Sequence, residues 1–255
     1  MKKGIDVSTL QGRIDWSLVN ADFAMLKATQ GRGETRATEN LRIFTDPAFG
    51  RNVVEASERG ILLGSYHYFT AANETEALLE AEYFCRVLEP YRDKLKLWAA
   101  VDVESQKWLA GVGKKQLSAT VSAFIQHVRS KGFRPMLYTN PDFLTYRFES
   151  LPDADIWLAH WNVSSPMKLE RMKLWQYGVE NIDGIGVCDA NYGYFDMRQN
   201  HKPNDTYTLQ KGDVYSNGKA VPPRLIGKSF TIRKVRQDRI LLAEINSWVK
   251  ISQLA

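Results

Sequence analysis

Short apolar runs recur along the first 195 residues and alternate with segments of helical periodicity. Between the early runs, apolar residues recur every three or four positions, as they do on one face of a helix. Strands that alternate with helices predict a parallel sheet, because parallel neighbours need crossover connections. Eight runs have the length and the β-branched or aromatic content of strands: 4–7, 23–29, 62–69, 95–104, 135–140, 155–161, 173–178 and 186–195.

Three of the helical segments carry start or stop signals. Asp46 and Pro47 predict the N-cap and first residue of a helix that Gly60 ends, and Asn73 with Glu76 predicts a capping box. The apolar face of the second helix would hold Leu78, Ala81, Cys85 and Leu88. That of the third would hold Leu117, Val121, Phe124, Ile125 and Val128.

The spacing of elements changes twice along the chain. After about residue 140 the gaps between strands shorten, so the last three strands are expected to join through loops or a turn of helix. Residues 1–200 are therefore predicted to form a closed α/β barrel whose final part is irregular. An open doubly wound sheet is the alternative. Residues 201–207 are polar and predict a linker, and 208–255 contain short strand patterns typical of a small all-β domain.

The charged residues are unevenly distributed along the chain. From residue 201 onward ten Lys and Arg stand against four Asp and Glu, a net charge of +6, although the whole chain carries only +5. No run reaches the roughly 20 apolar residues of a membrane span, and the first residues do not predict a signal peptide. Cys85 and Cys188 are expected to be buried thiols, and their pairing is left open.

One acidic pair ends an apolar strand. Asp102 and Glu104 flank a single residue, so in a strand their side chains share a face, with Cα atoms roughly 6.6 Å apart. The pairs Glu74/Glu76 and Glu80/Glu82 have the same spacing but lie on a helix, where solvated side chains are the expectation.

Other polar and aromatic residues are placed at the same rim, because the carboxyl ends of parallel strands meet at one end of a barrel. Each of these residues alone is also explained by packing or capping. Together, acids and aromatics without a metal-ligand pattern have the composition of a glycosidase cleft and predict no cofactor. The candidates are Asp6, Tyr66, His67, Tyr138, His160, Trp161, Gln176, Asp189 and Asn191.

Six segments resemble the family 25 glycoside hydrolases, the muramidases of phage endolysins and bacterial autolysins. They are "GIDVSTLQGRIDW", "FAMLKATQG", "DPAFGRNVVEASERGILLGSYHYF", "AAVDVE", "LWQYG" and "GVCDANYGYF", which occur in the family's order over about residues 4–195. The resemblance implies an irregular TIM-like (β/α)5(β)3 barrel. It also implies hydrolysis of the β-1,4 bond between N-acetylmuramic acid and N-acetylglucosamine in peptidoglycan.

The resemblance also assigns roles within the cleft. Glu104 would be the general acid, and Asp6, Asp102 and Asp189 the remaining acids. The nucleophile would be the substrate's own acetamido group, oriented or polarised by Asp102 or Asp189. From their place at the strand ends, and not from the resemblance, we expect six further residues to bind substrate: Tyr66, His67, Tyr138, Trp161, Gln176 and Asn191.

The chain departs from the family's pattern at three places. Gln30 stands where the family commonly has Glu, and Trp161 replaces a more usual Tyr. Residues 31–44 form a longer segment than usual, which could provide a lid or an extended subsite wall.

The C-terminal segment resembles a bacterial SH3-like domain through "GDVYSNGK" and "INSWVKISQL". Its positive charge suits anionic wall polymers, whereas the signatures of nucleic-acid modules are absent. We therefore expect action at the bacterial cell wall, after release by a holin-like or other non-classical route. A wall-binding protein without catalytic activity and a chitinase-like hydrolase are the alternatives, and the C-terminal segment could instead be a structural or dimerisation unit.

Overall fold

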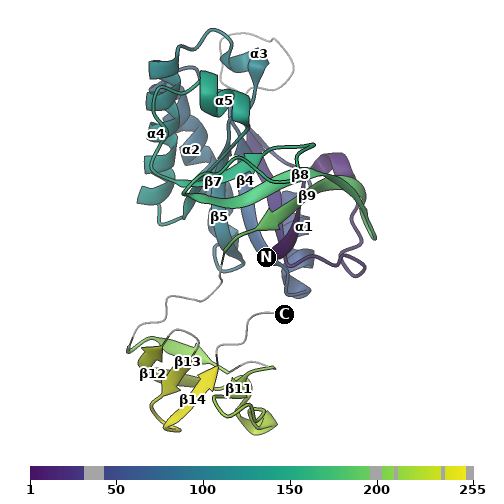
Figure 1. Ribbon diagram of the computed structural model, residues 1–255, viewed down its shortest axis with the longest axis vertical. Coiled ribbons are helices and arrows are strands. Elements are labelled where there is room, and N and C mark those ends of the chain that lie inside the picture. Colours follow the sequence, from purple (N-terminus) through teal and green to yellow (C-terminus); the bar gives the residue numbers. More distant parts are fainter. Residues whose placement is uncertain (32–42, 196–202, 210–211, 237–238, 251–255) are drawn as a thin grey trace. The chain divides into compact units, whose positions relative to one another are not determined.

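The computed structural model describes residues 1–31, 43–195, 203–209, 212–236 and 239–250. The chain divides into two units, Met1–Phe195 and Asp196–Ala255 (Figure 1). No helix in the described ranges is both long enough and apolar enough to cross a membrane.

Eight strands of the first unit close into a barrel, in the order β1-β2-β4-β5-β6-β7-β8-β9 and back to β1. All eight predicted strands are confirmed, and the pairing of β1 with β2 excludes the open sheet. Their bounds are β1 Lys2–Val7, β2 Phe23–Gln30, β4 Leu62–Tyr68, β5 Leu95–Asp102, β6 Pro135–Thr139, β7 Asp155–Ala159, β8 Met172–Ile182 and β9 Gly186–Gly193.

The last strand runs against the predicted direction. Neighbouring strands are parallel from β1 to β8, but β9 is antiparallel to both β8 and β1. The reason is local, because only the short turn between Ile182 and Gly186 joins β8 to β9, and a turn of that length returns the chain as a hairpin. A two-residue strand, β3 Phe44–Thr45, pairs antiparallel with the end of β2.

Three helices pack on the outside of the barrel (Figure 1): α1 Phe49–Glu58, α2 Glu74–Leu88 and α4 Lys114–Ser130. Shorter helical segments are η1 Thr9–Gln11, η2 Glu89–Tyr91, α3 Gln106–Leu109 and α5 Pro141–Tyr146. The connections from β7 to β8 and from β8 to β9, which are fully described, contain no helix. The outer face of β8 and β9 therefore lacks the helical cover that its neighbours have.

The helix signals are confirmed in part. Asn73 caps α2, because its side chain accepts a hydrogen bond from Glu76 N at 3.0 Å. The N-cap of α1 is Ala48 and not Asp46, whose carboxylate instead accepts from the Ala48 and Thr9 backbone amides. The predicted face of α4 is fully buried.

The predicted apolar face of α2 was wrong at one position. Leu78 is 44% exposed, and Glu80 is fully buried instead. The expectation that the Glu80/Glu82 pair is solvated is therefore wrong for Glu80, because α2 packs against the barrel on the side that carries this residue.

The core has two layers, one between barrel and helices and one inside the barrel. Inside the barrel, Phe195 meets Phe23 and Trp98 edge to face, with ring centroids 5.4 Å and 5.0 Å away. Gly4 makes room for Phe23, since a Cβ there would lie 2.3 Å from the ring. Cys85 and Cys188 are buried and free, and burial raises the pKa of both thiols to about 12.

The second unit contains a five-stranded antiparallel sheet in the order β10-β12-β13-β14-β11. Its elements are β10 Thr206–Thr208, β11 Val214–Tyr215, η3 Pro223–Leu225, β12 Ser229–Arg236, β13 Arg239–Leu242 and β14 Ser247–Lys250. β10 begins inside the range predicted as a linker, because Tyr207 is a buried member of this unit's own core. The sheet agrees with an all-β unit, and the SH3-like assignment stays a prediction.

Candidate active site

The four predicted acids meet although they come from three strands. Asp6 near the end of β1 is the register partner of Asp189 on β9, and their side chains are hydrogen-bonded. Asp102 is the last residue of β5, and Glu104 follows two residues later. The charge of Glu104 acts on Asp102, and that of Asp189 acts on Glu104. The structure thus brings all four carboxyl groups into one cluster.

Asp6 lies at the base of this cluster and is held from several sides. Its Oδ2 accepts hydrogen bonds from Gln176 Nε2 at 2.9 Å and from Asn191 Nδ2 at 2.8 Å. Burial, followed by the charge of Asp189, raises the pKa of Asp6 to about 8. Asp6 is therefore protonated at neutral pH and donates its proton towards Asp189, so the two carboxyl groups titrate as a pair.

Asp102 and Glu104 differ in their surroundings. Burial chiefly, and then the charge of Glu104, raises the pKa of Asp102 well above its usual value. Burial also raises the pKa of Glu104, against its hydrogen bond with Tyr138, which lowers it. Glu104 remains partly exposed, and so combines access to a ligand with a retained proton.

One acceptor atom of the cluster is unsatisfied. Asp102 Oδ1 is buried, and no donor in the described part of the chain lies within hydrogen-bonding distance of it. A buried acceptor without a partner is costly, and it becomes satisfied when a ligand brings an N–H or O–H group.

Aromatic side chains line the cluster. Tyr138 donates a hydrogen bond to Gln176 Oε1 at 3.0 Å, and Trp161 Nε1 donates to the same oxygen at 3.0 Å. Tyr66 meets Trp157 edge to face at 6.0 Å, and Asp6 and Asp102 are among the charges that raise its pKa. Trp161 is 42% exposed and offers its ring to a ligand.

His67 was predicted at this rim, but the structure places it elsewhere. Successive residues of a strand face opposite sides, and Tyr66 takes the inner side. His67 is fully buried against α2 and α4, where it stacks on Phe124 and bonds Glu80 Oε2 through Nε2 at 2.8 Å. It therefore lies outside the acid cluster.

Gln176 and Asn191 also differ from the prediction of direct substrate contact. They are 3% and 0% exposed, and the contacts described above show that they hold Asp6. His160 lies at the β7 end, where its Nδ1 accepts a hydrogen bond from Met167 N.

Lys27 belongs to the site and was missed from the sequence. It is partly buried on β2, it bonds Gln30 Oε1 at 2.7 Å, and its charge lowers the pKa of both Asp102 and Glu104. Burial in turn lowers the pKa of Lys27 itself. The available signal was a single charged residue inside the apolar strand "FAMLKAT". Most of the predicted lid lies outside the described residues.

The acid cluster is carboxylate and aromatic in character. Within the described ranges, no group of three or more His, Cys, Asp and Glu side chains is arranged to hold a metal ion. The arrangement can supply one partly exposed acid, neighbouring carboxyl groups and aromatic faces, which is the equipment for cleaving a glycosidic bond.

Comparison with known proteins decides the class. The family model of the glycosyl hydrolases family 25 matches residues 5–185. The chain belongs to that family.

Relatives and solved structures agree with this assignment. The chain is 32% identical over 204 residues to the uncharacterized protein YegX of Escherichia coli K12, covering 74% of this chain and 68% of YegX. It is 28% identical to Lysozyme M1 of Streptomyces globisporus, covering 74% of this chain and 66% of the relative. A family 25 glycosyl hydrolase structure from Bacillus anthracis matches with a TM-score of 0.61 and 25% identity, over 77% of this chain and 90% of that one.

Family 25 membership fixes what the first unit is. It is a glycoside hydrolase of the lysozyme type, built on a mixed α/β barrel of eight strands.

Proposed function

We propose that this family 25 enzyme is an N-acetylmuramidase, which cleaves the β-1,4 bond between N-acetylmuramic acid and N-acetylglucosamine in peptidoglycan. The observation that carries the proposal is Glu104, a partly exposed acid with a raised pKa beside three other carboxyl groups. Such an acid retains its proton for a leaving-group oxygen.

In the first step Glu104 protonates the glycosidic oxygen while the bond to the anomeric carbon breaks. The carbonyl oxygen of the substrate's acetamido group attacks that carbon and closes a five-membered ring. In the second step water adds to the anomeric carbon, the ring opens, and the Glu104 carboxylate takes the proton from water. The configuration is retained, as in the substrate-assisted exceptions to the two-carboxylate scheme.

Asp102 suits the acetamido group in this scheme. Its unsatisfied Oδ1 is an acceptor for the acetamido N–H, and that hydrogen bond would orient the carbonyl oxygen towards the anomeric carbon. The charge of Lys27 opposes the burial and the Glu104 charge that raise the pKa of Asp102. The hydrogen-bonded Asp6 and Asp189 pair would hold the floor of the site.

Wall targeting completes the proposal. The second unit would hold the enzyme at the bacterial wall through anionic polymers, because β12 exposes Arg233, Lys234 and Arg236. Peptidoglycan is then both the substrate and the surface on which the enzyme works.

The test is release of reducing sugar from purified peptidoglycan. Glu104→Gln is expected to lower kcat about 10²–10⁴-fold, the usual contribution of a general acid. The matched control is Glu149→Gln, which neutralises an exposed acid and should act like the wild type. Equal rates for Glu104→Gln and the wild type would contradict the assigned role.

Product analysis separates the remaining alternatives. Mass spectrometry of reduced products should find N-acetylmuramic acid at the new reducing end. N-acetylglucosamine there, or faster cleavage of chitin oligomers than of peptidoglycan, would favour a chitinase-like or glucosaminidase activity. Wall binding without any sugar release between about pH 4 and 8 would favour a non-catalytic binding protein.

A further inference from the structure

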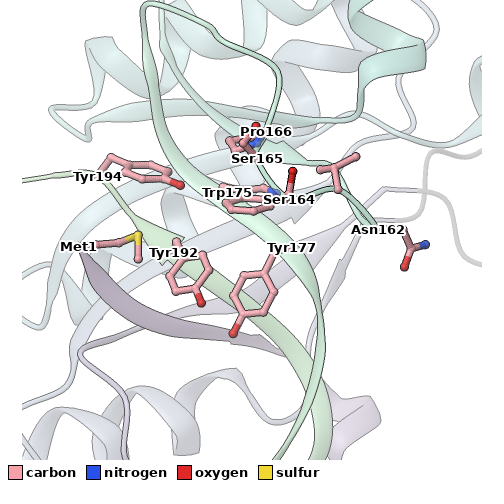
Figure 2. Close-up of a pocket in the computed structure, with 10 residues that line it drawn as sticks. Met1, Asn162, Ser164, Ser165, Pro166, Trp175, Tyr177, Tyr192 and Tyr194 are labelled. Carbon is pink, nitrogen blue, oxygen red and sulfur yellow. The ribbon is translucent and has the colours of Figure 1, made fainter.

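We propose that the outer face of β8 and β9 carries a second glycan-binding site, separate from the acid cluster. The site is an aromatic wall, which we define as Trp175, Tyr177, Tyr192 and Tyr194. These side chains line a hollow of about 670 Å³ (Figure 2). The glycan class rests on the proposed function, because the enzyme's polymeric substrate is the glycan strand that this wall would meet.

Strand geometry separates the two sites. On β8, Gln176 points inward and holds Asp6, so its neighbours Trp175 and Tyr177 point outward. On β9, Asn191 points inward to the same carboxylate, and Tyr192 points outward. The aromatic wall therefore shares two strands with the acid cluster but opens on the other side of the barrel wall.

The face is open because no helix covers it. α1, α2 and α4 pack on the β2 to β6 side, whereas the fully described connections around β8 contain loops only. Tyr194 remains 39% exposed, and Tyr177 and Tyr192 are half-buried.

The rings are held in place before any ligand arrives. Tyr177 and Tyr192 stack with their centroids 4.4 Å apart, and the Tyr177 hydroxyl donates to Glu180 Oε1 at 2.6 Å. Trp175 Nε1 donates to the His160 carbonyl at 2.8 Å. Rigid aromatic side chains lose little entropy on binding, which favours a recognition surface.

The lining side chains suit the faces and the hydroxyl groups of sugar rings. Among the described residues that line the hollow, none has a charged side chain, so the lining side chains are aromatic, apolar, hydroxyl and amide groups. Asn162, Ser164 and Ser165 add an amide and hydroxyls to the lining. Sugar rings present apolar C–H faces to aromatic rings, and hydroxyl and acetamido groups to such polar side chains.

A second contact would increase retention on the polymer. A strand bound in the cleft and another segment bound at the aromatic wall share one protein molecule, which raises the effective concentration of each for the other. The predicted signature is therefore a preference for long strands over short oligomers.

The test compares two probes on the full chain: solubilised long glycan strands and a tetrasaccharide of the same repeat. Binding is measured in a Glu104→Gln background, so that hydrolysis does not interfere. Tyr177→Ala and Tyr194→Ala are each expected to raise the Kd for long strands about 3- to 10-fold, and to raise the ratio of that Kd to the tetrasaccharide Kd. Tyr177→Phe should retain most of the affinity, because it keeps the stacked ring and folds with the least disturbance.

The control is Val187→Ala, which changes an exposed apolar residue of the same hairpin outside the hollow. If Tyr177→Ala and Tyr194→Ala both bind long strands as tightly as the parent protein does, the proposal is overturned. Equal losses on both probes would also overturn it, since the wall would then belong to the cleft or to the fold. A wild-type dimer that Tyr177→Ala dissociates would reassign the surface to self-association.

The two proposals fail separately. If the wild type releases reducing sugar and the tyrosine variants bind long strands like the parent, only the second site is refuted. If the wild type releases no sugar but the tyrosine variants still lose affinity for long strands, only the catalytic proposal is refuted.

Discussion

The carboxyl groups of the acid cluster have different neighbours, and the neighbours separate their chemistry. Asp6 is surrounded by amide donors and by Asp189, Glu104 faces a tyrosine hydroxyl, and Asp102 keeps an unsatisfied oxygen. Four similar side chains therefore differ in which of them keeps a proton and which accepts one.

The variant Asp6→Asn tests whether the Asp6 carboxyl group is protonated in the folded protein. The folded pKa of Asp6 is raised from 3.8 to about 8, so its stabilising contribution is full below pH 3.8 and is lost as pH rises towards 8. Asn keeps an oxygen that accepts from Gln176 and Asn191 but does not titrate. The free energy of unfolding of the wild type should therefore fall with pH between about 4 and 8, by at most about 1.4 kcal/mol per pH unit from this residue.

The measurement is denaturant unfolding of both proteins at several pH values across that interval. Asp6→Asn should show a flatter pH dependence than the wild type and, at pH 7, a higher free energy of unfolding. Parallel curves for the two proteins would show that Asp6 is already ionised in the folded state.

At the scale of elements, each barrel strand serves two environments. β4 directs Tyr66 to the acid cluster and His67 to the helix layer. β8 directs Gln176 to Asp6 and Tyr177 to the outer face. Because adjacent residues point to opposite sides, a short motif can contribute to a site and to the packing around it at once.

Helix α2 is anchored to β4 through a buried carboxylate. Glu80 accepts hydrogen bonds from the Thr70 hydroxyl at 2.7 Å and the Thr70 amide at 3.2 Å, beside its bond with His67. Glu80→Ala is expected to lower the free energy of unfolding by about 3–5 kcal/mol, because it leaves buried polar partners unpaired. Denaturant unfolding of both proteins at neutral pH measures this loss of stability.

Glu82→Ala is the matched control two residues along the same helix. Glu82 pairs with Lys131 and His127 in solvent, with its side chain 52% exposed, so its loss should change stability far less. Similar losses for the two variants would contradict the anchoring role of Glu80.

At the scale of the whole molecule, barrel closure assembles the acid cluster. Asp6 lies on the first strand and Asp189 on the last, and the pairing of β1 with β9 makes them register partners. The chain then continues into a second unit with its own core, in which the excess of positive charge is concentrated.

Charge reversal on β12 tests the wall-binding role of the second unit. Arg233→Glu with Lys234→Glu is expected to lower binding to intact walls several-fold at low salt, and wild-type binding should itself weaken as salt rises. Co-sedimentation with walls measures both effects. The control, Lys114→Glu with Lys115→Glu, makes the same charge change in the first turn of α4, where acidic residues are tolerated. Equal binding by the two double variants would exclude a specific role for β12.

The amino-acid sequence by itself determined the local features of this protein. The eight strands, the Asn73 cap, the buried face of α4 and the acid pair at the end of β5 were all predicted, because each depends on residues within a few positions of one another. The ordered motifs also gave the family, since they extend over most of the first unit.

Only the tertiary structure decided which side of each strand and helix faces the acid cluster, the apolar core or solvent. The barrel strands under the helices are covered on both sides, so apolar residues occur on both and the pattern does not mark the inner one. That is why His67 was expected in the cleft, Lys27 was missed and Glu80 was expected in solvent. The meeting of Asp6 with Asp189 likewise depends on closure of the barrel, which pairs residues almost the full length of the first unit apart.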